Sequence, residues 1–139
     1  MKRLITFLLL ILFASYFLYS QVEGKKEKEV KKSDPVFVVV EEMPTFQGGD
    51  ANKFKEWVQK RVEYPRELIQ ERVEGKVFVM FVVEPDGSVT NASIMRGLHP
   101  KLDKETLNVV NSSPLWKPGL QRDVPVRVRF SITIEYNLI

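Results

Sequence analysis

Residues 126–137 read VRVRFSITIEYN, in which apolar and polar side chains alternate without a break. Because successive side chains of a strand point to opposite faces, this period of two predicts a half-buried strand with one polar face. The apolar positions are Val126, Val128, Phe130, Ile132, Ile134 and Tyr136. A sheet that holds this apolar face against a core is therefore the first element of the predicted fold.

A hairpin precedes this strand in the sequence. Residues 76–84 are nearly all apolar, and residues 88–96 resume in extended form after the turn residues Pro85-Asp86-Gly87. The first strand is apolar on both faces, with Val77, Val79, Phe81 and Val83 on one and Phe78, Met80 and Val82 on the other. This pattern predicts a central strand that is shielded on each side.

Helical patterns lie on either side of the hairpin. They cover residues 51–62 after the expected N-cap Asp50, residues 65–74, and residues 100–113 with His99 at the helix entrance. A β-branched run at 36–40 adds a short strand, and we expect Trp116 to be a core anchor under a turn. The order of elements predicts an α+β fold in which a small antiparallel sheet packs against helices.

The N-terminal quarter differs in composition from the rest. Lys2 and Arg3 precede an apolar run from Leu4 to Tyr19, so residues 1–21 are expected to be a signal peptide or a membrane anchor. Residues 22–34 are a linker rich in lysine and glutamate that reaches at most about 45 Å when extended. Residues 35–139 form the folded domain, which in either case works outside the cytoplasm.

Composition excludes several classes of function. The net charge of +3 comes from residues before Pro35, so the folded domain lacks the basic surface that nucleic acid requires. There is no cysteine, and His99 is the only histidine, so thiolate chemistry and His-assisted catalysis lack their residues. We therefore expect no enzyme, no cofactor and no metal site.

Four short motifs occur in a fixed order before the alternating strand. They are Tyr64-Pro65-Arg66, Glu74-Gly75-Lys76-Val77, Val83-Glu84-Pro85-Asp86-Gly87-Ser88-Val89 and Trp116-Lys117-Pro118-Gly119. Together they resemble the TonB C-terminal domain family, and the resemblance covers residues 40–138. It implies an energy transducer in the cell envelope of a Gram-negative bacterium, with an inner-membrane anchor coupled to the ExbB/ExbD motor. The periplasmic domain would bind the TonB box of outer-membrane receptors and support active transport of nutrients.

The resemblance also implies where a receptor binds. The Tyr-Pro segment lies near the receptor contact in this family, and the receptor peptide adds as a strand beside the C-terminal strand. An edge strand with unpaired backbone groups is a template for such an addition. The expected partner-binding residues are Tyr64, Pro65, Arg66, Arg127, Arg129, Ser131, Thr133 and Glu135. The alternative is that the charges on the last strand only solvate one face of the sheet.

Two departures from the family pattern leave other functions open. The run from Leu4 to Tyr19 has no histidine, which the family's anchor uses to couple to its motor, and a long proline-rich segment is missing. The alternatives are a periplasmic strand-binding module without energy coupling, secreted or tethered in the envelope, and a homodimer that pairs through its edge strands.

Overall fold

The computed structural model describes residues 2–20 and 34–139, which fall into two separate units. The first unit contains one helix, α1 (Lys2–Ser20). Among the residues described, no helix combines the length and the apolar character needed to cross a membrane. Most of the expected linker, residues 22–33, lies outside the described residues.

The second unit is built on a sheet of five strands. They are β1 (Val36–Phe37), β2 (Gly75–Val83), β3 (Val89–Arg96), β4 (Gly119–Gln121) and β5 (Val124–Tyr136). The strand order is β1-β5-β2-β3, and β4 forms a hairpin with the first residues of β5. All pairs are antiparallel except β1 with β5, so the predicted antiparallel sheet carries one short parallel addition. Strand β4 was not predicted from the sequence.

The register between β2 and β5 decides which side chains enter the core. The two strands pair without interruption from Gly75 opposite Tyr136 to Val83 opposite Val128. Their apolar alternations are in phase, so Val79 faces the same side as Ile132. A slip of one residue would turn every apolar side chain of one strand to the opposite face, which fixes this register.

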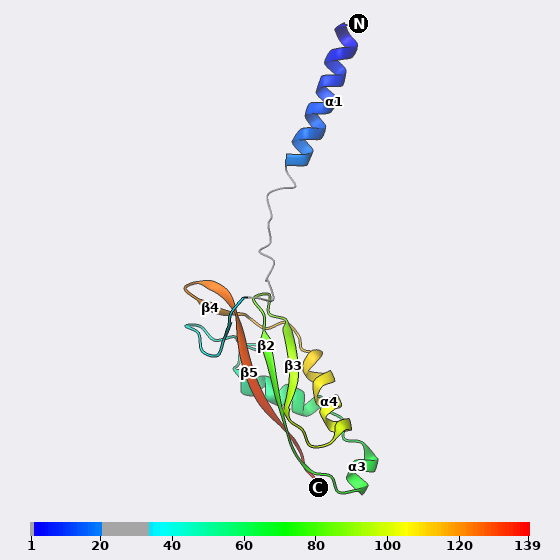
Figure 1. The fold of residues 1–139 in the computed structure, drawn as a ribbon, viewed down its shortest axis with the longest axis vertical. Helices are drawn as coiled ribbons and strands as arrows, with labels where there is room; N and C mark the ends of the chain where they lie inside the picture. The colour runs from blue at the N-terminus through cyan, green and yellow to red at the C-terminus, as the bar shows by residue number, and fades with distance from the viewer. Residues whose placement is uncertain (1, 21–33) are drawn as a thin grey trace. The chain divides into compact units, whose positions relative to one another are not determined.

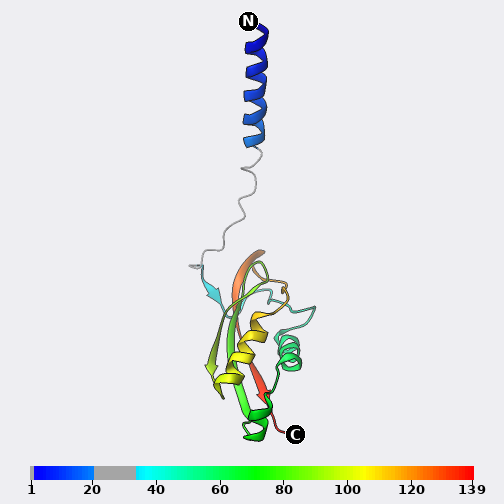
Figure 2. The same cartoon turned by 90° about the vertical axis from the view of Figure 1, so that its right-hand side faces the viewer.

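Three helices complete the domain: α2 (Ala51–Arg61), α3 (Arg66–Gln70) and α4 (Pro100–Asn111). The expected N-cap of α2 is confirmed, because Asp50 accepts from the Asn52 N–H at 2.9 Å. His99 lies at the start of α4 as expected, and there its Nδ1 accepts from the Lys101 N–H at 3.1 Å. Figures 1 and 2 show α2 and α4 on the same side of the sheet, where both contribute to one core.

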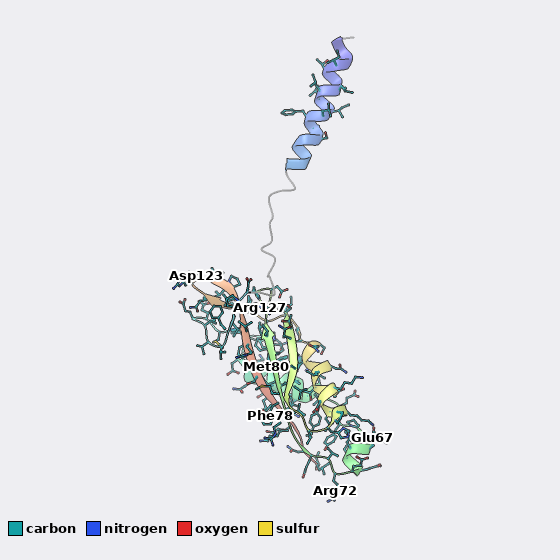
Figure 3. The ribbon with its side chains drawn as sticks, viewed as in Figure 1. Glu67, Arg72, Phe78, Met80, Asp123 and Arg127 are labelled. Atoms are coloured by element: carbon teal, nitrogen blue, oxygen red, sulfur yellow. The ribbon has the colours of Figure 1, made fainter. Side chains whose placement is uncertain are left out.

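The opposite face of the sheet lacks such a cover. Val82 is buried there, but Phe78 and Met80, labelled in Figure 3, are only half-buried. The expectation that both faces of this strand are shielded is therefore wrong for these two residues. Helices α2 and α4 cover the first face, and α3, the third helix within residues 34–139, contributes Leu68 to that same core.

An aromatic cluster closes the core near the β2–β3 turn. The ring of Trp116 lies 5.0–5.8 Å from the rings of Phe46, Phe54, Phe81 and Phe130, measured between centroids. Only 3% of Trp116 is exposed, and its backbone N–H donates to the Gly87 carbonyl at 2.8 Å. Trp116 is therefore the core anchor under a turn that its sequence context predicts.

The energetic cost of crowding between Gly87 and Trp116 can be measured by comparison with Gly48, which has a similar backbone conformation. Gly87 and Gly48 have φ values of +86° and +79°, but a Cβ would lie 2.0 Å from the Trp116 carbonyl oxygen at Gly87 and would meet nothing within 4 Å at Gly48. We expect Gly48→Ala to lower the free energy of unfolding by about 1–2 kcal/mol, the cost of the left-handed backbone. Gly87→Ala should cost at least about 3 kcal/mol. Equal losses in urea unfolding would contradict the close contact.

Candidate functional site

The predicted Tyr-Pro segment connects α2 to α3 and is held firmly by the domain. The Tyr64 hydroxyl donates to the Val73 carbonyl, and its ring packs edge-on against Tyr136 with centroids 5.4 Å apart. Burial raises the pKa of Tyr64 above its ordinary value, and the negative charge of Glu74 adds to this effect. The hydroxyl therefore stays a donor at neutral pH. Pro65 caps α3, and Arg66 is the exposed first residue of that helix.

The last strand has one fully paired edge and one edge that is only partly paired. Its residues from Val128 to Tyr136 pair with β2 on one side. On that same side, β4 pairs with the strand up to Val126, and on the other side β1 pairs with Arg127 and Val128. Beyond Val128, no strand of the described chain pairs with this edge, which forms the left border of the main sheet in Figure 1.

The backbone of this open edge is ready to pair. In an antiparallel ladder, the N–H and C=O groups of alternate residues point to the same side. The Glu135 N–H and C=O form hydrogen bonds with the side chain of Gln59 in α2, so they point away from β2. By the same alternation, the N–H and C=O groups of Arg129, Ser131 and Thr133 also point away from β2. Their side chains lie on the polar face, where Arg129 and Ser131 are exposed and Thr133 is half-buried. The structure thus brings three predicted site residues together on one edge.

Arg127 has a different environment from the other predicted residues. Only 5% of it is exposed, and its guanidinium donates to both carboxylate oxygens of Glu84 at 3.0–3.2 Å and to the Asp34 carbonyl at 3.1 Å. The Thr90 hydroxyl also donates to Glu84, at 2.5 Å. This network joins the start of the domain to the turn of the β2–β3 hairpin, and Arg127 is labelled at that end of the sheet in Figure 3. Among the predicted residues of the last strand, Arg129, Ser131, Thr133 and Glu135 are therefore the ones that remain candidates for contact with a partner.

A groove lies between the end of β5 and Tyr64. Its lining includes Lys55, Gln59, Val62, Tyr64, Glu135 and Tyr136, from α2, the Tyr-Pro segment and the end of β5. It therefore unites residues that are far apart in the sequence and that were predicted separately. Lys55 and Gln59 were not predicted, because on sequence evidence they are ordinary polar positions of an amphipathic helix. In the parts covered by the structure, no group of histidine, cysteine, aspartate and glutamate side chains could hold a metal ion.

Comparison with known protein families identifies the family of this chain. Residues 60–138 match the family model described as Gram-negative bacterial TonB protein C-terminal, and the chain belongs to this family. A search of curated protein sequences gave no match.

Two solved structures match part of this chain, both NMR solution structures of the TonB C-terminal domain of Helicobacter pylori. One is 23% identical with a TM-score of 0.49, covering 63% of this chain and 91% of that chain. The other is 24% identical with a TM-score of 0.49, covering 64% of this chain and 80% of that chain.

A comparison of Arg127 with Arg129, on the same face of β5, tests how much the Arg127–Glu84 ion pair contributes to stability. Arg127→Gln would leave the Glu84 carboxylate, which is largely buried, without its charged partner, and we expect a loss of about 3–5 kcal/mol in the free energy of unfolding. Arg129→Gln changes an exposed side chain and should stay within about 0.5 kcal/mol of wild type. Chemical denaturation of both variants measures the difference. Similar stability of the two variants would show that the pair contributes little.

Proposed function

We propose that this protein is a TonB-like energy transducer whose folded domain binds the TonB box of outer-membrane receptors and so supports active uptake of nutrients. The observation that carries the proposal is the open edge of β5 between Arg129 and Thr133. The TonB box would add there as a strand, through hydrogen bonds between backbones, which is a common mode of peptide recognition. In this role the chain binds and transmits force, and it catalyses no reaction.

The surroundings of the edge supply specificity. An added strand would lie beside the exposed Arg129 and Ser131, so its charges would meet a guanidinium on the polar face. Lys76 lies 3.8 Å from Glu135, which partly balances the carboxylate at the far end of the edge. Charges of this kind contribute to partner selection and association rate more than to affinity. Tyr64, Pro65 and Arg66 would form the adjoining part of the contact surface.

The edge is also suited to bearing load. β5 pairs with β2 over the nine residues of β2, so a pull along a docked strand is shared by a long row of hydrogen bonds. A strand pulled lengthwise loads these bonds together, whereas a strand peeled from its end would load them one at a time. Docking along β5 is thus consistent with a domain that transmits force to a receptor.

A proline at position 131 tests the backbone docking directly. The Ser131 N–H points to the open edge, so Ser131→Pro removes a donor for the docked strand and no donor of the β2–β5 ladder. We expect the variant to remain folded and to bind a synthetic TonB-box peptide at least about 10-fold more weakly, since both the donor and the space at the edge are lost. Isothermal titration calorimetry measures the affinity.

Ser131→Ala serves as the control, because it removes the side-chain hydroxyl and keeps the backbone donor. Its peptide affinity should equal that of wild type. Unchanged binding by Ser131→Pro would place the peptide elsewhere on the domain. A concentration-dependent dimer that Ser131→Pro dissociates, together with no peptide binding, would support the homodimer instead.

The N-terminal segment separates the transducer from a second candidate, a strand-binding module without energy coupling. That candidate is favoured by the short reach of residues 22–34, about 45 Å, and by the lack of histidine in residues 4–19. A transducer must keep residues 1–21 as its anchor to engage the ExbB/ExbD motor. Mass spectrometry of the mature chain decides: a start at Met1 or Lys2 supports the transducer, and a start near Gln21 supports the released module.

A further inference from the structure

Gln59 of α2 already occupies one position on the open edge of β5. Its Nε2 donates to the Glu135 carbonyl at 2.6 Å, and its Oε1 accepts from the Glu135 N–H at 2.9 Å. A primary amide carries one carbonyl acceptor and N–H donors, as a peptide group does. The side chain therefore makes the two hydrogen bonds that a residue of a neighbouring strand would make with Glu135.

This contact marks one end of the edge that a partner can use. At the other end, Phe37 of β1 pairs with Val128. In this parallel register the Arg129 N–H faces the Phe37 C=O, so an incoming strand meets the Arg129 C=O and the N–H and C=O groups of Ser131 and Thr133. Gln59 also lines the groove that contains Lys55, Val62 and Tyr64, so a strand that continues along β5 to Glu135 meets this side chain at the groove.

We propose that Gln59 is an internal competitor of the docked strand, and that a strand long enough to reach Glu135 displaces the Gln59 amide. The inference rests on the proposed strand docking and adds a determinant of strand length to it. A short strand uses three pairing residues and leaves Gln59 in place. A longer strand replaces the two amide bonds with two backbone bonds and places its next side chains in the groove beside Tyr64.

A docked strand can displace the Gln59 amide because Glu135 exchanges two hydrogen bonds with the amide for two with the strand. Gln59 is half-buried and lines an accessible groove, so its side chain can rotate toward solvent without moving the helix backbone. In wild type, a longer strand therefore gains little from pairing with Glu135, since it only replaces bonds that already exist. Without the amide, the Glu135 N–H and C=O face water, and pairing with them becomes a net gain.

The experiment compares a short and a long peptide on the full chain. Both are taken from one TonB-box sequence: one of about five residues spans Arg129 to Thr133, and one of about nine residues continues past Glu135. We expect Gln59→Ala to raise the ratio of long-peptide to short-peptide affinity by about 5- to 25-fold, from one or two additional net hydrogen bonds. The affinity for the short peptide should not change.

A second glutamine provides a matched control. Gln121 Oε1 accepts from the Glu41 N–H at 3.0 Å, a side-chain bond to the backbone on β4, away from the open part of the edge. Gln121→Ala should leave the affinity ratio at its wild-type value. A rise in that ratio for Gln121→Ala equal to the rise for Gln59→Ala would overturn the proposal, because the effect would then be nonspecific.

Amide hydrogen exchange at Glu135 gives a readout that does not depend on affinity. The Glu135 N–H should be protected in free wild type, exchange faster in free Gln59→Ala, and regain protection when the long peptide binds. An unchanged affinity ratio, or weaker binding of both peptides by Gln59→Ala, overturns the competitor role alone. If wild type binds neither peptide, the proposed docking fails and the competitor role fails with it.

Discussion

The domain depends on the in-register pairing of β2 with β5. Nine residues of β2, Gly75–Val83, face β5 without a bulge, and the apolar alternations of the two strands are in phase. This pairing places one apolar face under α2 and α4. It also decides which backbone groups of β5 are used inside the sheet and which point away from it, because the two alternate along the strand. The core and the candidate docking edge are thus consequences of one register.

The second edge of β5 shows how a protein can limit the length of strand edge that is left open for pairing. Unpaired strand edges invite unwanted association, and natural proteins usually cover them or interrupt them. Here β1 covers the beginning of the edge at Arg127 and Val128, and Gln59 occupies its far end. What remains open is the short stretch from Arg129 to Thr133. A stretch of this length is sufficient for a peptide partner and offers little to a second sheet.

Arg127 and Arg129 show how far an alternating pattern determines a residue's role. Both belong to the polar face of the same strand, two residues apart. Arg127 lies where β1 and the β2–β3 turn converge, and Glu84 binds its guanidinium in a nearly dry site. Arg129 lies just past the end of β1 and is exposed. The difference comes from elements that are distant in the sequence, so the alternation alone carries no sign of it.

The sequence by itself determined the elements whose signals are local. Alternation identified β5, turn residues and apolar runs identified the β2–β3 hairpin, cap residues identified the starts of α2 and α4, and ordered motifs indicated the family. Only the tertiary structure decided the parallel pairing of β1, the existence of β4, the exposure of Phe78 and Met80, the partner of Arg127 and the contact of Gln59 with Glu135. The last contact joins residues 76 positions apart. Local patterns arise from the period of one element, whereas such contacts depend on how separate elements pack, and no short stretch of sequence encodes that packing.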